Sequence, residues 1–431
     1  MLDNRARRRQ LIGEIERLRG SRLITYVTSD RDNCQGQIDE NVVRPMYDHL
    51  LELNRAGNDH GEELPQLDLF LYSRGGAVDA PWRIVSMIRS VSVGFAVLVP
   101  FRAQSAATMI ALGADEIVLG RKGELGPIDP SLSVQRQGAG GALIDDRINI
   151  EDVMAYVKFV RDKAGITDQS GLAAALAALT EYPGPLILGT IYRTHSHIRS
   201  VAERLLESRE TPFDDQRNQL LIDTLAERTY AHGHAIGRNE AAEMGLPVVS
   251  PEPELERLMW ELFVEYERAL RLNDPVDPVA YLDGAEERSE PVTLALVESS
   301  WGLSTYDGLL TVKAARNLPE ELNVDLNLHV QMPDSIDLST LSDTESAALQ
   351  SFVEGLRAHL LETLEKPVHD EIARQAPIVD YTINIAGLKW TQREPAGAGE
   401  QSEAERAAPQ PRRGAAKRSA GAKKGAGKTK P

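Results

Sequence analysis

The chain has 431 residues, of which 42% are hydrophobic and 26% charged, and its formal net charge is −17. This length exceeds one ordinary domain, and the composition is that of a folded soluble protein with an ample core. The charge is uneven, because residues 411–431 carry eight Lys and Arg and no acidic residue, whereas the preceding residues carry all 65 Asp and Glu. The acidic body repels nucleic acid and anionic membranes, so only the tail is expected to bind an acidic partner or nucleic acid, and weakly.

The cysteine content and the hydropathy of the sequence bear on the cellular compartment in which the protein is expected. Cys34 is the only cysteine, so the chain cannot form an internal disulfide, and we expect a reducing compartment. The apolar run at residues 95–101 is far shorter than the roughly 18 residues that a membrane span needs. The arginines near the N-terminus are not followed by an apolar stretch of the kind that a secretory signal has. We therefore expect a cytoplasmic protein without membrane insertion.

Up to about residue 130, short apolar runs alternate with stretches of helical periodicity. Residues 1–20 have the pattern of an amphipathic helix, and strand-like runs bounded by turn residues follow it. The expected strands are residues 23–27, 67–72, 93–99 and 116–119, and the expected helices between them are residues 81–90 and 105–112. Strands that alternate with helices indicate an α/β layered domain.

The second half of the chain is organised differently. Helices are expected at residues 150–164, 172–179, 195–208, 213–230 and 252–272. The breaker cluster Asn273-Asp274-Pro275-Val276-Asp277-Pro278 then marks a boundary. After it, strands are expected at residues 292–297, 309–312, 324–330 and 381–385, with one helix at residues 343–364. The last part is rich in Ala, Gly, Pro and charged residues without apolar periodicity, which is typical of disorder. We expect a main domain at residues 1–275, an α+β accessory domain at 276–390 and a disordered basic tail at 391–431.

Two adjacent glycines follow the expected strand at residues 67–72. Gly75 and Gly76 lie in the segment Ser73-Arg74-Gly75-Gly76-Ala77-Val78-Asp79, just before an expected helix. Paired glycines let the backbone turn sharply and present N–H groups to a ligand. One such donor contributes about 3–4 kcal/mol to stabilising the oxyanion of a tetrahedral intermediate. The alternative is a tight turn without a chemical role.

A serine opens the next expected helix. Ser105 follows the strand at residues 93–99 and precedes Ala106 and Ala107, whose small side chains let a substrate backbone approach. The free N–H groups and positive potential of a helix start favour an alkoxide or acyl-enzyme there. The alternative is that Ser105 is an ordinary N-cap, the commonest role of a serine in this position.

Together these segments resemble the Clp/crotonase superfamily of serine peptidases. More narrowly, they resemble the serine dehydrogenase proteinase (SDH) family, which is related to signal-peptide peptidase A. The resemblance covers about residues 10–270 and rests on four segments, in the order and at the spacing of the family: Ser73-Arg74-Gly75-Gly76, Ser105-Ala106-Ala107 running into Ala114-Asp115-Glu116-Ile117, Gly123-Glu124-Leu125-Gly126-Pro127-Ile128-Asp129-Pro130, and Glu240-Ala241-Ala242-Glu243-Met244-Gly245-Leu246.

The resemblance implies a fold and a mechanism. It implies a stacked β-β-α superhelix, Ser105 as the nucleophile, and an oxyanion hole formed by backbone amides at Gly75, Gly76 and Ala106. It also implies a homo-oligomer, because members of the superfamily commonly form closed rings or trimers. The chain departs from the pattern at Arg74, where these peptidases often have proline; this arginine either binds a carboxylate, contacts a neighbouring subunit or simply accommodates the turn.

The general base is the least determined part of the site. Clp-type peptidases have a histidine about 25 residues after the serine, but this chain has none in that neighbourhood. Relatives of signal-peptide peptidase A use a lysine roughly fifty residues after the serine, and Lys158 lies at that spacing on an apolar helical stretch. Burial would lower the pKa of its ammonium and make it a base. A snorkelling surface lysine is the alternative, and His232, His234 and Lys163 are other candidates for the base.

We expect no metal and no cofactor. The pairs His195/His197 and His232/His234 alternate as metal ligands can, but no cysteine or carboxylate cluster accompanies them. The favoured interpretation is a serine endopeptidase acting on peptide or protein substrates. Two alternatives remain open: an inactive peptidase-fold scaffold or binding protein that lacks a base, and a crotonase-like acyl-CoA enzyme that would not need a nucleophilic serine.

Overall fold

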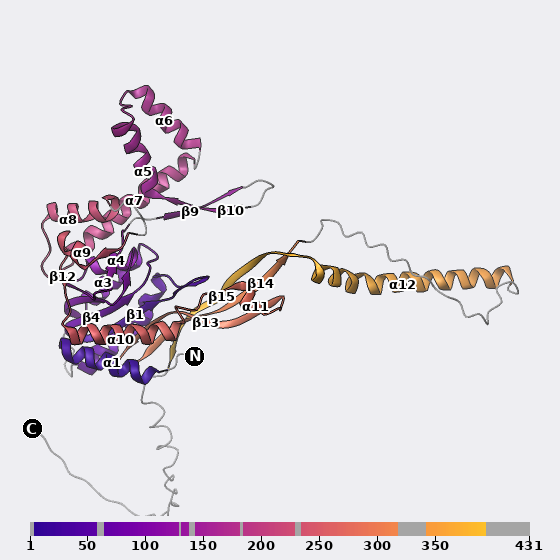
Figure 1. Ribbon diagram of the computed structural model, residues 1–431, viewed down its shortest axis with the longest axis horizontal. Helices are drawn as coiled ribbons and strands as arrows, with labels where there is room; N and C mark the ends of the chain where they lie inside the picture. The colour runs from indigo at the N-terminus through magenta and orange to yellow at the C-terminus, as the bar shows by residue number, and fades with distance from the viewer. Residues whose placement is uncertain are drawn as a thin grey trace, which may run out of the picture. The chain divides into compact units, whose positions relative to one another are not determined.

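The computed structural model of the chain describes residues 4–57, 64–128, 131–137, 143–181, 184–228, 234–317 and 342–393. Its largest element is an eight-stranded mixed sheet with the order β12-β7-β5-β4-β1-β13-β14-β15 (Figure 1). The strands are β1 (Arg22–Thr28), β4 (Leu64–Tyr72), β5 (Ser92–Val99), β7 (Glu116–Leu119), β12 (Val248–Val249), β13 (Glu287–Ser299), β14 (Leu303–Arg316) and β15 (Ile378–Arg393). The five strands from β12 to β1 pair in parallel, and the remaining three continue the sheet in antiparallel pairs.

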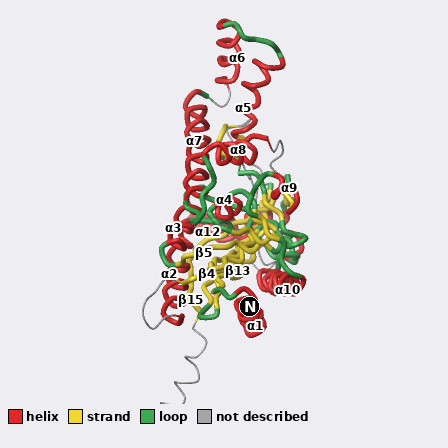
Figure 2. The backbone as a smooth tube through the Cα atoms, turned by 90° about the vertical axis from the view of Figure 1, so that its left-hand side faces the viewer, coloured by secondary structure: helices red, strands yellow, loops and turns green. Residues whose placement is uncertain are grey.

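Helices cover both faces of the parallel strands (Figure 2). Successive residues of β4 show this directly, since Leu69 and Leu71 join one hydrophobic core while Phe70 and Tyr72 join the other. A strand buried on both faces reads as a continuous apolar run, as residues 67–72 do. The first core is covered by α2 (Val43–Gly57), α3 (Ala80–Arg89), α4 (Ala106–Leu112) and α7 (Pro185–Glu207), and the second by α1 (Arg5–Arg19) and α10 (Pro253–Leu270). The predicted α/β layered architecture is confirmed.

A second, smaller sheet gives the repeating unit of the fold. The chain leaves β5, forms the short strand β6 (Arg102–Ala103) and enters α4; it leaves β7 and forms β8 (Glu124–Leu125). These short strands make a three-stranded sheet of order β11-β8-β6, completed by β11 (Ile236–Gly237). Each long strand followed by a short strand in another sheet is the stacked β-β-α arrangement predicted from the sequence. The expected strands and helices of residues 23–119 are all present.

The segment after residue 130 is mainly helical, as expected. A hairpin of β9 (Ser131–Gln137) and β10 (Leu143–Asn149) leads into it. Its helical elements are α5 (Ile150–Lys158), the π-helical turn η3 (Phe159–Lys163), α6 (Gln169–Glu181), α7, α8 (Asp215–Asp223), the π-helical turn η4 (Thr224–Arg228) and α9 (Arg238–Glu243). Helix α7 begins ten residues earlier than the expected start at residue 195.

By length and composition, no single helix among the described residues suffices to cross a membrane. Two helices, Gln169–Thr180 and Pro185–Glu207, are long and apolar enough only when taken together, and they are bent by 97° relative to each other.

The strands after residue 276 continue the main sheet. β13 pairs antiparallel with β1 over five residue pairs, from Ile24↔Ser299 to Thr28↔Ala295. The described residues up to Arg393 belong to one compact unit. A boundary at 276 would therefore separate two neighbouring strands, and the independence of residues 276–390 stays a prediction. The expected strand at 324–330 lies outside the described residues, as does the basic tail from residue 394 on; its first three residues, 391–393, end β15.

The remaining elements are four short ones and one long helix. Beside the first strands lie β2 (Asp30–Arg31), β3 (Cys34–Gln35) and the 3-10 turn η1 (Glu40–Val42). After the breaker cluster come α11 (Pro278–Leu282) and α12 (Asp343–Gln375), which contains Pro367 and runs beyond the expected end at residue 364.

Candidate active site

Ser105 has a backbone conformation that side chains rarely adopt. It is the N-cap of α4 with φ 52° and ψ −116°, and its side chain makes no capping hydrogen bond. A non-glycine residue at positive φ costs of order 1–3 kcal/mol and persists only where the surroundings impose it. In α/β-hydrolases, a sharp strand-to-helix turn presents the hydroxyl of the nucleophilic serine. The conformation therefore fits a nucleophile better than an ordinary cap.

The packing around α4 imposes this turn. All seven residues of the helix are buried, and Thr108 Oγ1 lies 2.7 Å from Ala103 O and 2.9 Å from Gly126 O. The Gly126 N–H in turn donates to Thr108 Oγ1 at 3.0 Å. A Cβ atom on Gly126 would lie 3.0 Å from Gln104 Cβ, so the segment before Ser105 is closely confined. The strain at Ser105 is thus held by a buried, hydrogen-bonded core.

The glycine loop lies directly against Ser105. Ser73 pairs with the segment before the serine, because its N–H donates to Arg102 O and its carbonyl accepts from the Gln104 N–H, both at 3.0 Å. Gly75 has φ 112°, and a Cβ there would lie 2.7 Å from Ser105 Cβ and 3.1 Å from Ser105 Oγ. Glycine is therefore required at this position by both conformation and space.

The second glycine is fixed by a segment that the sequence did not connect to the site. Gly76 forms an isolated parallel bridge with Ile38, whose N–H donates to Gly75 O and whose carbonyl accepts from the Ala77 N–H, both at 2.8 Å. A Cβ on Gly76 would lie 2.1 Å from Ile38 O. Only the long-range pairing of the fold brings residue 38 here, so no local sequence signal could have identified it.

The three predicted oxyanion donors are not equivalent. The Gly75 N–H donates to Ser73 Oγ at 3.0 Å, so Gly75 contributes space in front of Ser105 rather than an available donor. Within the described part of the chain, the N–H groups of Gly76 and Ala106 donate to no acceptor. The Gly76 N–H comes directly after Gly75, and the Ala106 N–H comes directly after Ser105. They can stabilise a negative oxygen formed beside Ser105 Oγ.

Beside the site lies a network of charged groups that neutralise one another. Asp30 Oδ2 accepts from both Arg74 Nε and Arg102 Nη1 at 3.1 Å, and Glu124 Oε1 pairs with Arg102 Nε at 3.2 Å. Gln104 Nε2 donates to the same Glu124 oxygen at 3.1 Å. Arg74, the residue that departs from the family pattern, thus binds a carboxylate of its own chain. The network fixes the strand that precedes Ser105.

The predicted bases lie in different surroundings. Lys158 ends α5 and Lys163 ends η3, and both side chains are exposed in the single chain. His234 is also exposed, with its Nε2 2.8 Å from Glu240 Oε1. His232 lies outside the described residues. The role of each as a base stays a prediction.

Helix α7 carries two further histidines, which the sequence pattern suggested only as metal ligands. His197 Nε2 lies 2.7 Å from Asp79 Oδ1, three residues after Gly76. His195, two residues earlier on the same helix, is half-buried. Among the described residues, no group of three or more His, Cys, Asp or Glu is arranged to hold a metal ion. A stripe of Ile191, His195, Ile198 and Ala202 at helical spacing was the available signal.

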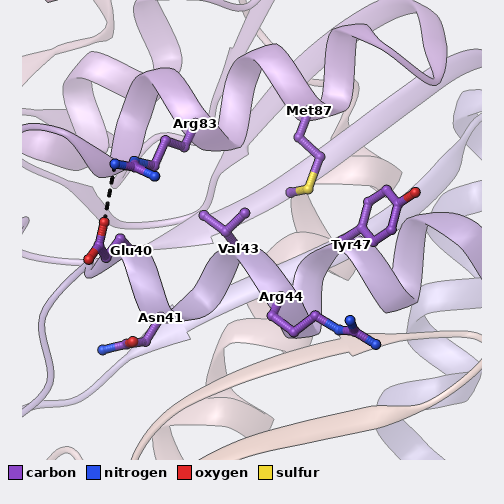
Figure 3. A pocket seen from close by; sticks show the side chains of 7 residues that line it. All are labelled: Glu40, Asn41, Val43, Arg44, Tyr47, Arg83 and Met87. Carbon is purple, nitrogen blue, oxygen red and sulfur yellow. Dashed lines mark ion pairs between the residues drawn. The ribbon is translucent and has the colours of Figure 1, made fainter.

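A separate hollow is lined by residues of η1, α2 and α3. Its lining is shown in Figure 3, where Arg83 of α3 reaches Glu40 of η1 and Met87 faces Val43 and Tyr47 of α2. The Arg83–Glu40 pair is 3.3 Å long and exposed on both sides. The hollow contains no serine, cysteine or histidine, and it shows how α3 is fastened to the segment that carries Ile38.

The chain is similar in sequence to a known family and to proteins of one archaeon. Residues 1–144 match the family of ClpP-like SDH-type serine proteinases. Two uncharacterized proteins of Methanocaldococcus jannaschii are similar: MJ1495 is 23% identical over 290 residues, which are 66% of this chain and 85% of the relative. MJ0137 is 25% identical over 217 residues, 50% of this chain and 63% of the relative.

Two solved structures are also similar to the chain. A mutant of the 1510-N membrane-bound stomatin-specific protease is 15% identical, with a TM-score of 0.31 over 54% of this chain and 80% of that one. ClpP1 from Listeria monocytogenes is 16% identical, with a TM-score of 0.29 over 56% of this chain and 98% of that one.

Proposed function

Since residues 1–144 belong to the ClpP-like SDH-type serine proteinases, we propose that this protein is a serine peptidase that hydrolyses peptide bonds through an acyl-enzyme on Ser105. The observation that carries the proposal is the backbone of Ser105, held at φ 52° beside Gly75 with two available N–H donors next to it. A strained serine with donors on either side is suited to acyl transfer.

The proposed reaction has two steps. Ser105 Oγ attacks the carbonyl carbon of the substrate while its proton passes to a base, and the N–H groups of Gly76 and Ala106 stabilise the resulting oxyanion. The C–N bond then breaks, the base returns the proton to the leaving amine, and an ester on Ser105 remains. Water, deprotonated by the same base, hydrolyses that ester and releases the acid product.

An inactive peptidase-fold scaffold is the second candidate. It is favoured by the exposure of Lys158, because lysines that act as bases are typically buried and Lys158 is not. A scaffold would keep the glycine loop and Ser105 but would not turn over a substrate.

We also propose that the protein works as a homo-oligomer. The outlying helical segment, residues 150–192, exposes large apolar side chains to solvent: Leu186 is 86% exposed, Tyr192 67% and Phe159 58%. Apolar side chains gathered on one segment of a folded protein are typical of an interaction surface. A second copy of this chain, bound there, would also bury α5 and with it the end that carries Lys158. A cytoplasmic location and weak binding of an acidic partner or nucleic acid by the tail stay predictions.

Peptide hydrolysis by purified variants tests the proposed activity. Ser105→Ala should abolish turnover of a fluorogenic peptide library, while Ser90→Ala, at an exposed serine at the end of α3, should retain it. Both variants should keep the far-UV circular dichroism spectrum of the wild type. Wild-type turnover by Ser105→Ala would rule out the acyl-enzyme, and a wild type without turnover whose Ser105 also resists serine-directed probes would favour the scaffold.

A further inference from the structure

The proposed peptidase reaction needs a group that accepts the proton of Ser105, and α7 places a histidine at the right level of the fold. This inference rests on the proposed function, because it names the base of the same site. It starts from the way in which α7 packs beside α3 and α4.

Contacts along the second half of α7 and just after it show that the helix runs in the same direction as α3 and α4. Near its middle, His197 Nε2 lies 2.7 Å from Asp79 Oδ1, at the start of α3. Toward its end, a Cβ on Gly113, at the end of α4, would lie 3.3 Å from Leu205 Cδ2. After the helix, Arg209 Nη2 donates to Asp115 O at 3.2 Å.

These contacts fix the level of each α7 residue relative to Ser105. With a rise of about 1.5 Å per residue, His195 lies about 15 Å before Leu205, and Ser105 about 12 Å before Gly113. The Cα of His195 thus lies about 3 Å before that of Ser105 along the shared direction, toward the N-terminal end of α7. Helical side chains lean toward the N-terminus of their helix. The imidazole is therefore expected just before the N-terminal end of α4, which is the end that carries Ser105.

His195 also lies on the inner side of α7. Ile191, Ile198 and Ala202 share its face at helical spacing, and each is at most 2% exposed. Residue 198 and residue 202 belong to the same hydrophobic core as Ala106 and Ala107. The Nε2 atom of His195 is shielded from solvent. His197, two residues on, points to another side, where it is exposed and bound to Asp79.

We propose that His195 is the general base of this site. A neutral imidazole accepts a proton near neutral pH without any help from burial, whereas an exposed lysine does not. One ring nitrogen takes the Ser105 proton as Oγ forms its bond to the substrate carbonyl carbon. The imidazolium then protonates the leaving amine as the C–N bond breaks, and the neutral ring is restored. The Asp79–His197 contact holds α7 at the level that this transfer requires.

The test compares His195→Ala with three variants under identical conditions: Lys158→Ala, His234→Ala and, as a control on the exposed side of α7, Arg193→Ala. Removing a general base costs roughly 100- to 10,000-fold in turnover. His195→Ala should lose at least 100-fold and recover part of it with added imidazole, while Arg193→Ala stays within about twofold of the wild type. Imidazole rescue would not follow from a merely structural role. His195→Gln serves as a second variant if the alanine substitution prevents folding.

Two outcomes would overturn the proposal. One is wild-type turnover in a folded His195→Ala or His195→Gln protein; the other is a loss that imidazole leaves unchanged while Lys158→Ala or His234→Ala shows the rescue instead. Covalent labelling of Ser105 by a fluorophosphonate in the wild type is measured in parallel. If the wild type neither labels nor turns over, the peptidase proposal has failed; if it does both and His195 is dispensable, only the assignment of the base has failed.

Discussion

Two parts of the chain lie beyond residues 1–144, and they are built in opposite ways. Strands β13 and β14 extend the main sheet, and residues such as Leu296, Val297 and Leu303 are buried within its two cores. The outlying helical segment, residues 150–192, instead points Leu186 and Tyr192 into solvent. An apolar side chain that contributes to stability is buried in the monomer, whereas one that is exposed is available to a partner. We infer that the C-terminal strands serve the fold and that the outlying segment serves assembly.

Truncation before β13 should give the largest effect. A chain ending at Pro275 exposes the edge of β1 and leaves Arg8, which is fully buried, without Glu298, its partner at 2.7 Å. Breaking a buried ion pair on one side alone costs about 3–5 kcal/mol, and the lost apolar burial adds to it. We expect no cooperative thermal transition by circular dichroism, in contrast to a chain ending at Arg393. A folded, soluble 1–275 fragment, as an independent accessory domain would allow, would contradict this interpretation of β13.

Two glycine-to-alanine substitutions compare the packing of the two parts. One adds a methyl group against β13, and the other adds a methyl group to the outlying helical segment. A Cβ on Gly36 would lie 2.1 Å from Leu294 O of β13, whereas one on Gly189 of α7 meets nothing within 4 Å. Forcing an atom into a packed site costs about 1–3 kcal/mol, and replacing glycine by alanine in a helix gains about 0.5–1 kcal/mol. Gly36→Ala should therefore lower, and Gly189→Ala raise, the free energy of urea-induced unfolding. Shifts of the same sign would show that the parts do not differ in packing.

The pH dependence of stability tests the contact between α2 and the strands β13 and β14, which is made by His49. Burial, reinforced by the charge of Arg5, lowers the pKa of His49 to about 4. Its ring nitrogens lie 2.7 Å from Ser299 Oγ and 3.1 Å from Ser304 Oγ. Below the unfolded value of about 6.5, only the unfolded chain binds this proton, so stability falls until the pH reaches about 4.

The matched variant His49→Asn isolates this contribution. The wild type should lose up to about 3 kcal/mol between pH 6.5 and 4 from this group, since each unit of pKa shift is worth about 1.4 kcal/mol. His49→Asn, less stable at pH 7, should show a shallower decline in unfolding free energy over the same range. Parallel declines in the two proteins would mean that the histidine is not held neutral.

Charged substitutions on the outlying segment should have the smallest effect on stability. Leu186→Glu with Tyr192→Glu changes side chains that contact solvent, so the unfolding free energy of the monomer should change by less than about 0.5 kcal/mol. The molar mass from light scattering, in contrast, should fall from that of an oligomer to that of one chain. An unchanged mass would place the subunit contacts elsewhere, and a large loss of stability would mean that the segment packs against its own chain.

The sequence located the parts of the site whose signals are local. Gly75–Gly76 and Ser105 each follow a buried strand, and a turn that needs glycine or a serine before a helix can be read from neighbouring residues. What it could not provide was pairing over long distances. The bridge between Ile38 and Gly76 and the pairing of Arg74 with Asp30 depend on how strands far apart in the chain are laid side by side.

Periodicity predicted the burial of side chains least well in the helical segment around Lys158. An apolar stretch around Lys158 suggested a buried lysine, but the single chain leaves that side chain exposed. Periodicity shows that a face is apolar and does not show what covers it. The boundary at residue 276 likewise rests on a local cluster of Pro and Asp, and such a cluster does not show that β13 pairs with β1, so the boundary stays a prediction.

The most direct measurement is mass-spectrometric mapping of the adduct formed with a fluorophosphonate probe. The probe reacts with a serine whose oxygen is activated and whose oxyanion is stabilised, which is what the geometry of Ser105, Gly76 and Ala106 is proposed to provide. We predict one modified peptide, with the label on Ser105, and no labelling of the Ser105→Ala variant. Labelling of a different serine, or an unmodified wild-type protein under conditions that label a known serine hydrolase, would contradict the assignment of Ser105 as the nucleophile.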